Sequence, residues 1–110
     1  MKVIFKRVVI DYFLELVNVL YEKEYFGYLE TAKSYSRSLF EEIKNDLPNK
    51  TKKNAPSYFD RYGTGMQYSV FKKNKNTSWY VFFNTYHQSG ETIYFVRFVS
   101  NNHVVAQYLN

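Results

Sequence analysis

The fold is decided by residues 78–84, which read Ser78-Trp79-Tyr80-Val81-Phe82-Phe83-Asn84. Successive side chains of a strand point to opposite faces of its sheet, so Trp79 and Phe83 share one face. Tyr80 and Phe82 share the other face. Helices packed on one face cover only one of these pairs, which predicts a second, open face that carries aromatic rings. The chain has 12 tyrosines, and tyrosine tolerates a half-wet surface. This surface is either an aromatic binding face or a tyrosine-rich surface without a partner.

Similar runs follow and precede this stretch. We expect strands over Gln67 to Lys72, Ser78 to Tyr86 and Thr92 to Val99, because these runs are rich in β-branched and aromatic residues. The joints between them, residues 73–76 and 87–90, are typical of turns. Three strands joined so tightly predict an antiparallel meander.

Upstream of these strands, apolar residues recur every three or four positions, as they do in helices. A first helix is expected over residues 10–21, with Asp11 as a cap near its start and Gly27 marking the break after it. A second helix begins at Leu29 and stops at Pro48, because proline cannot donate the next backbone hydrogen bond. Its apolar stripe consists of Leu29, Ala32, Ser36, Leu39, Ile43 and Leu47. The two helices predict an antiparallel hairpin.

Three segments remain. They are a strand over Lys2 to Val9, an irregular stretch over residues 48–65, and a tail in which Asn101 or Asn102 caps a short final helix. The order of strand, helical pair and three strands predicts an α+β fold in a single domain over residues 1–110. Its compact solution is a twisted sheet with the helices packed on one face and the other face open.

Composition narrows the class of protein. The chain has 110 residues, 45% of them hydrophobic, which is enough for a packed core. It has no cysteine, so there is no disulfide or thiolate metal site, and a reducing cytoplasm is expected. Charged residues break the first apolar run too early for a signal peptide, and no run approaches the ~20 apolar residues of a membrane span. We therefore expect a small soluble protein.

Positive charge is concentrated in one segment. Residues 50–75 carry seven basic side chains against Asp60 alone, a sum of +6, whereas the whole chain has a net charge of +5. The basic residues are Lys50, Lys52, Lys53, Arg61, Lys72, Lys73 and Lys75. Such a segment either collects phosphates by electrostatic attraction or forms a solvated loop that keeps the protein soluble.

Several strings resemble the RelE/ParE superfamily of toxins from bacterial type II toxin–antitoxin pairs. They are Ala32–Leu39 in the second helix, Thr77–Phe83 in the middle strand, and Val96–His103 near the end of the chain. The order of elements is similar as well. The resemblance implies a toxin that cleaves messenger RNA on the ribosome, without a metal or other cofactor, and that a cognate antitoxin protein neutralises. Two alternatives stay open: a toxin of the same fold that inhibits DNA gyrase, and a decayed toxin that acts as a non-catalytic binding module.

Arg97 is the strongest candidate for a catalytic residue. It is the only charge inside Thr92–Val99, and an unpaired buried charge is costly, so it must reach solvent, an acid or a ligand. The resemblance places it where ribosome-dependent relatives use an arginine of the last strand. The alternative is a structural ion pair with a helix glutamate.

Two C-terminal residues are further catalytic candidates. His103 follows Arg97, and an imidazole side chain in general titrates near neutrality; the alternative is that His103 lies in the first turn of a tail helix. Tyr108 supplies either a hydroxyl or a packing contact. His87 is expected to be solvated at a hairpin tip.

The candidate RNA-binding and phosphate-binding residues are Lys52, Lys53, Arg61, Lys72, Lys73 and Lys75. Relatives carry an arginine at the start of the middle strand, where this chain has Thr77, Ser78 and Trp79. Loss of one well-placed charge contact costs about two to three powers of ten in rate, so Lys72, Lys73 or Arg61 would have to replace it. No acidic pair has metal-binding spacing, and Gly63-Thr64-Gly65 is too short for a phosphate-binding loop.

Overall fold

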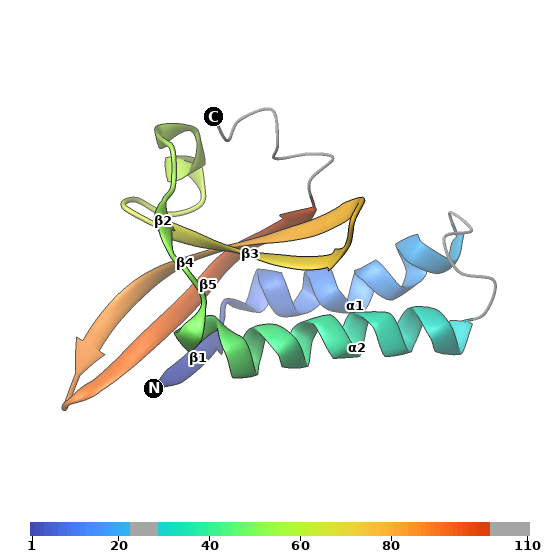
Figure 1. Ribbon diagram of the computed structural model, residues 1–110, viewed down its shortest axis with the longest axis horizontal. Helices are drawn as coiled ribbons and strands as arrows, with labels where there is room; N and C mark the ends of the chain where they lie inside the picture. Colours follow the sequence, from blue (N-terminus) through green and yellow to red (C-terminus); the bar gives the residue numbers. More distant parts are fainter. Residues whose placement is uncertain (23–28, 102–110) are drawn as a thin grey trace.

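The computed structural model describes residues 1–22 and 29–101, and within them two helices pack on one face of a five-stranded sheet (Figure 1). The predicted α+β class with two helices is confirmed. The expected break at Gly27, the tail helix, His103 and Tyr108 lie outside the described residues.

The sheet is mixed and has the strand order β1-β5-β4-β3-β2. β3 (Gln67–Asn74), β4 (Thr77–Gln88) and β5 (Glu91–Asn101) pair antiparallel, β1 (Lys2–Phe5) lies parallel to β5, and β2 (Lys53–Asn54) lies on the far edge. Ser89 and Gly90 both have positive φ, which is the geometry of the tight hairpin turn between β4 and β5. All three long strands extend beyond their predicted ends, and β2 was not predicted.

The helices are amphipathic and cover the face that carries Trp79 and Phe83. α1 (Arg7–Glu22) buries Val9, Phe13, Leu16 and Leu20, and α2 (Leu29–Asp46) buries Ala32, Ser36, Leu39 and Ile43. The small residues of α2 let the helices approach, and the Ser36 hydroxyl donates a hydrogen bond of 2.9 Å to the Phe13 carbonyl. A short 3-10 helix, η1 (Leu47–Asn49), follows α2 at Pro48, where the α-helical hydrogen bonding was expected to stop.

The N-terminal strand is shorter than predicted. It ends at Phe5, and the Lys6 backbone N–H makes the last hydrogen bond to the sheet, 2.8 Å from the Val96 carbonyl. α1 begins at Arg7, so Asp11 is the fifth residue of the helix and does not cap it. Instead Asp11 forms an exposed ion pair of 3.2 Å with Arg7, one helical turn earlier.

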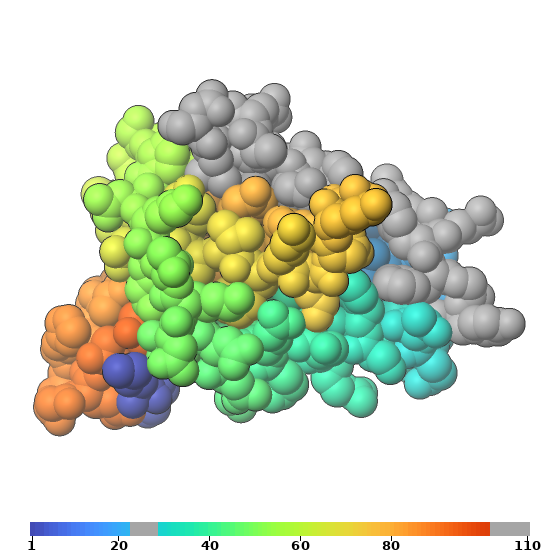
Figure 2. All heavy atoms as spheres, in the orientation of Figure 1, coloured from blue at the N-terminus to red at the C-terminus, as the bar shows by residue number. Residues whose placement is uncertain are grey.

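The face away from the helices is covered in part, which corrects the prediction of an open face. Residues 55–66 cross it, including the 3-10 helix η2 (Ser57–Arg61), and form a second small core of Phe59, Met66 and Phe82. The Phe59 and Phe82 rings stack with their centroids 4.4 Å apart. Figure 2 shows the segment between α2 and β3 running from the helical layer to the opposite side of the molecule. The prolines and glycines of residues 48–65 had indicated irregular structure. The buried side chains of Phe59 and Met66 anchor residues 55–66 to the sheet.

Candidate functional site

Arg97 is the extra residue of a β-bulge. The pairing of β4 with β5 passes from Phe82 opposite Phe98 directly to Phe83 opposite Val96, so Arg97 has no partner across the ladder. Arg97 and Phe98 therefore both lie on the face that residues 55–66 cover, whereas Val96 and Val99 belong to the helix-covered core. Bulges re-aim side chains in this way and are common beside active sites.

The Arg97 guanidinium has only neutral partners. Its Nε donates to Oδ1 of Asn84 at 2.5 Å, its Nη2 donates to the Tyr86 hydroxyl at 3.1 Å, and its central carbon lies 4.8 Å from the centroid of the Phe95 ring. None of the ion pairs found within residues 1–22 and 29–101 includes Arg97, so the structural ion pair with a helix glutamate is absent there. Contacts with described residues use two of its five N–H donors and leave three for an anion.

A hollow of about 600 Å³ opens beside Arg97, and we call it the cationic hollow. Three cations from separate parts of the chain line it: Lys6 from the junction of β1 and α1, Arg61 from the end of η2, and Arg97 from β5. The other lining residues are Val8, Val9, Tyr12, Tyr62, Phe98, Val99 and Ser100. Within residues 1–22 and 29–101, no acidic side chain lines the hollow, so these residues attract anions.

The first turn of α1 also lines the cationic hollow, through Val8 and Val9. That turn contains no acidic residue. The unpaired N–H groups at a helix N-terminus carry a partial positive charge, which adds to the field of the three cations.

The segment that covers the second face, residues 55–66, contributes one cation and one aromatic ring to the cationic hollow; we call it the covering segment. The Arg61 Nε donates to the Tyr58 carbonyl at 3.0 Å, and its guanidinium lies 3.9 Å from the centroid of the Tyr58 ring. The next residue, Tyr62, stacks on Phe98 with the centroids 3.9 Å apart and the planes only 3° from parallel. The stack holds Tyr62 against the sheet, and the contacts with Tyr58 hold Arg61 within its own segment.

Tyr12 is one of two tyrosines on the described lining, and Tyr62 is the other. Burial, and to a smaller extent the neighbouring Tyr35, raises the pKa of Tyr12 to about 12. The phenol is therefore protonated at neutral pH and can donate a hydrogen bond, but it is a poor proton acceptor.

Lys52 lies elsewhere and has a structural contact. Its ammonium donates to the carbonyls of Leu47, Pro48 and Lys50 at 3.0, 3.1 and 2.9 Å. These bonds satisfy carbonyl groups in η1 and directly after it. Desolvation by burial lowers the pKa of Lys52. Its three N–H donors are matched by these three carbonyls, so little is left for a phosphate.

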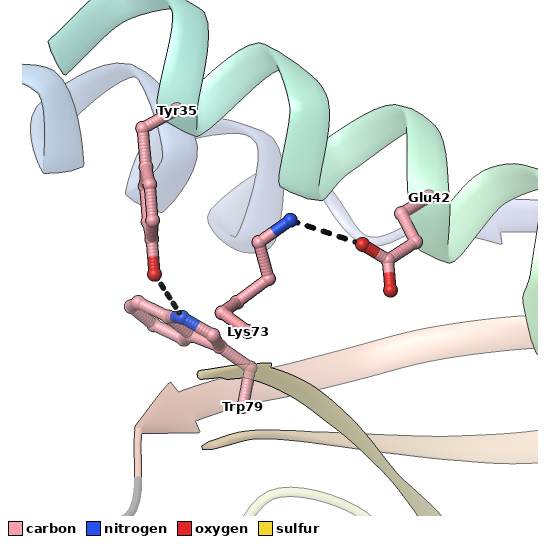
Figure 3. Close-up of polar contacts among 4 residues, drawn as sticks. All are labelled: Tyr35, Glu42, Lys73 and Trp79. Carbon is pink, nitrogen blue, oxygen red and sulfur yellow. Dashed lines mark hydrogen bonds and ion pairs between the residues drawn. The ribbon is translucent and has the colours of Figure 1, made fainter. Parts of the chain in front are cut away.

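Lys73 fastens the sheet to the helical layer, as Figure 3 shows. Its Nζ lies 3.0 Å from Oε1 of Glu42 on α2, and both side chains are largely shielded from solvent. Beside this ion pair, the Trp79 indole N–H donates to the Tyr35 hydroxyl at 2.9 Å (Figure 3). The two contacts join β3 and β4 to α2.

Of the seven described residues predicted as site residues, only Arg61 and Arg97 meet in the cationic hollow. Lys53, Lys72 and Lys75 are exposed and do not line it. Five residues of the site were not predicted. Lys6, Tyr12 and Tyr62 line the cationic hollow with the two arginines, and Asn84 and Tyr86 accept hydrogen bonds from Arg97. The one available signal was the spacing of Asn84 and Tyr86, which puts them on one face of a strand.

The remaining observations concern metal ions, membranes and His87. Within residues 1–22 and 29–101, no group of three or more His, Cys, Asp or Glu side chains could hold a metal ion. Neither described helix is long and apolar enough to cross a membrane. His87 is exposed near the β4–β5 turn, with Nδ1 3.3 Å from the Thr92 hydroxyl.

A second hollow, of about 550 Å³, lies between α1 and α2, and we call it the helix groove. Its lining is mostly apolar and includes Leu14, which is 67% exposed, and Leu29, which is 40% exposed. The charged residues on the lining are Lys33 and Arg37, both basic.

Comparison of the chain with protein-family models, curated proteins and solved structures finds no match.

Proposed function

We propose that this chain is a toxin of the RelE/ParE kind that binds messenger RNA in the cationic hollow and cleaves it on the ribosome without a metal ion. One observation carries the proposal: Lys6, Arg61 and Arg97 converge on one hollow, and none of the lining residues that the structure describes is acidic. Phosphates of RNA are the polyanion that such a cluster suits. The order of a strand, a helical pair and an antiparallel set of strands is also similar to that family.

The chemistry proposed is an attack of the ribose 2′-hydroxyl on the adjacent phosphorus. The 2′-oxygen loses its proton to a base and bonds to phosphorus, the bond from phosphorus to the 5′-oxygen breaks, and that oxygen takes up a proton. Negative charge grows on the phosphate oxygens during the attack. The three N–H donors of Arg97 that have no partner among the described residues, together with Arg61 and Lys6, would stabilise this charge.

Proton transfer needs other groups. Tyr12 is protonated at neutral pH because of its raised pKa, so its role is that of a hydrogen-bond donor. None of the described lining residues is a histidine or a carboxylate, which leaves His103 and Tyr108 as the sequence-based candidates for acid and base.

The aromatic rings beside the cations suit single-stranded RNA. Proteins that read single strands combine cations for the backbone with aromatic faces on which bases stack. Tyr62 and Phe98 line the cationic hollow next to the two arginines. We therefore propose that the substrate enters as an unpaired strand.

The test is induced expression in a bacterium. We expect growth arrest with truncated messages, and we expect Arg97→Ala and Arg61→Ala to relieve both. Lys44→Ala, which removes an exposed charge from α2, is the control and keeps the arrest. Growth arrest with intact messages in every variant would contradict the proposal, and accompanying DNA damage would favour gyrase inhibition instead.

The helix groove favours a protein partner, which we propose is the cognate antitoxin. Amphipathic helices bind by laying an apolar face into such a groove, and its basic lining residues, Lys33 and Arg37, favour acidic flanks on that helix. We expect Leu14→Glu to weaken the complex with a co-expressed antitoxin, whereas Arg97→Ala leaves it intact. Harmless expression of the wild type with a stable complex would favour the non-catalytic binding module.

A further inference from the structure

We propose that Asn84 and Gly63 are positioning residues, which hold the Arg97 guanidinium in one orientation toward the cationic hollow. The inference deepens the proposed function and rests on it only for the identity of the ligand. It assigns a role to the contact between the β-bulge and the covering segment, residues 55–66.

Asn84 joins these two parts of the chain through both ends of its amide. Its Oδ1 accepts from Nε of Arg97 at 2.5 Å, and its Nδ2 donates to the Thr64 carbonyl at 3.0 Å. The two contacts fix the amide orientation, because a flipped amide would set a donor against a donor and an acceptor against an acceptor. Arg97 is thus tied to the covering segment as well as to β4.

Gly63 provides the space that Arg97 occupies. A Cβ atom at this position would lie 2.5 Å from Cδ of Arg97, 3.1 Å from its Nε and 3.1 Å from Sδ of Met66. The Gly63 backbone is not in the left-handed region, so its conformation alone does not require glycine. Gly65 is the opposite case: its φ of +67° favours glycine, and a Cβ there would meet nothing within 4 Å.

Positioning of this kind raises affinity because the arginine is ordered before the ligand arrives. A free arginine samples many rotamers, and its ordering opposes binding. Here Asn84 and Tyr86 each occupy one donor and leave the remaining N–H groups in a fixed fork. The clash at Gly63 involves a flexible side chain, so alanine there is expected to displace Arg97 and leave the chain folded.

The direct readout is the side-chain Nε–Hε signal of Arg97 in 15N-resolved NMR spectra of the unliganded protein. We expect a slowly exchanging signal in the wild type, and loss or a large shift of it in Asn84→Ala and in Gly63→Ala. Thr64→Ala, which keeps the backbone carbonyl that Asn84 uses, and Asn45→Ala, which removes an exposed amide on α2, are the controls and leave the signal unchanged. An unchanged signal in both test variants, with thermal unfolding as in the wild type, would overturn the inference.

Binding separates this inference from the proposed function. The probe is a short single-stranded RNA with 2′-methoxy groups, which cannot be cleaved, and the readout is fluorescence anisotropy. We expect about tenfold weaker binding for Asn84→Ala and Gly63→Ala, and binding within twofold of the wild type for the controls. Asn84→Asp keeps the acceptor but adds a negative charge, so it should retain the Arg97 signal and still weaken binding.

Each outcome has one meaning. If the wild type does not bind the RNA while the Arg97 signal responds as expected, the RNA proposal fails and the positioning inference stands. If the wild type binds, Arg97→Ala abolishes binding, and both positioning variants bind as the wild type does, the positioning inference fails and the RNA proposal stands.

Discussion

The two faces of the sheet differ in how they are covered. On the face beneath α1 and α2, 15 described residues form a buried hydrophobic core, whereas the hydrophobic core on the face beneath residues 55–66 consists of three described residues, Phe59, Met66 and Phe82. Two of the three cations of the cationic hollow, Arg61 and Arg97, belong to the loop-covered face. The comparison teaches that the helical face supplies most of the stability, while the loop-covered face supplies the polar site with just enough packing to hold it in place.

The largest expected effect is on the helical face. Phe83 is fully buried there and packs edge-to-face against Tyr94, with the centroids 5.7 Å apart. We expect Phe83→Ala to lower the free energy of unfolding by about 3–5 kcal/mol, because it deletes a ring and leaves a cavity. Urea unfolding measures this, and Leu14→Ala, on the exposed surface of α1, serves as a control that changes it little. A loss below about 1 kcal/mol would contradict the assignment of the main core to this face.

A smaller effect is expected on the loop-covered face, together with a loss of binding. Phe59 is 1% exposed and stacks on Phe82, so Phe59→Ala should cost about 3 kcal/mol, at the lower end for such changes because the covering segment can readjust. The same variant should weaken RNA binding, since Phe59 anchors the segment that carries Arg61 and Gly63. Unfolding in urea and anisotropy report the two effects. Destabilisation without a change in binding would break the proposed link between the small core and the site.

Tyr12 lies where the two faces meet, and it predicts a smaller, pH-dependent effect. Its pKa is about 12 in the folded chain and about 10 in an unfolded one. Below pH 10 the phenol is neutral in both the folded and the unfolded state, so its titration does not lower the free energy of unfolding there. Between pH 10 and 12 the unfolded state loses the proton first, so stability falls as the pH rises.

Tyr12→Phe removes this dependence. Urea unfolding at pH 9 and pH 11 should therefore show a smaller loss of stability for the variant than for the wild type. The other titratable groups are the same in the two proteins and contribute equally to both. Equal losses would mean that Tyr12 is not shielded from solvent as described.

The helical face could be predicted well because its signal is periodic. Of the predicted stripe, Leu29 at the start of α2 is exposed, whereas the residues from Ala32 to Ile43 are buried in α2 and Leu47 is buried in η1. Trp79 and Phe83 lie beneath the helices. The end of the N-terminal strand could not be predicted, because valines and an isoleucine stand on both sides of Lys6 and Arg7 and suit a strand as well as a helix. β2 has only two residues, both polar, and gives no strand signal.

The site was predicted less completely, for a physical reason. Arg97 could be selected because it is a lone charge in an apolar strand, but the bulge that sets its direction depends on pairing with β4. The sequence does not distinguish the lysines of residues 50–75 that make structural contacts from those that were expected to bind phosphate. Backbone carbonyls surround Lys52 and a carboxylate pairs with Lys73, and both arrangements arise only from tertiary contacts.

The most direct measurement is an NMR titration of all four arginine Nε–Hε signals with the uncleavable RNA. The chain contains Arg7, Arg37, Arg61 and Arg97, two of which line the cationic hollow while two do not. We expect the signals of Arg61 and Arg97 to shift together with one dissociation constant, and the signals of Arg7 and Arg37 to remain unchanged. Shifts at Arg37 with none at Arg97, or no shift at any arginine, would contradict this expectation.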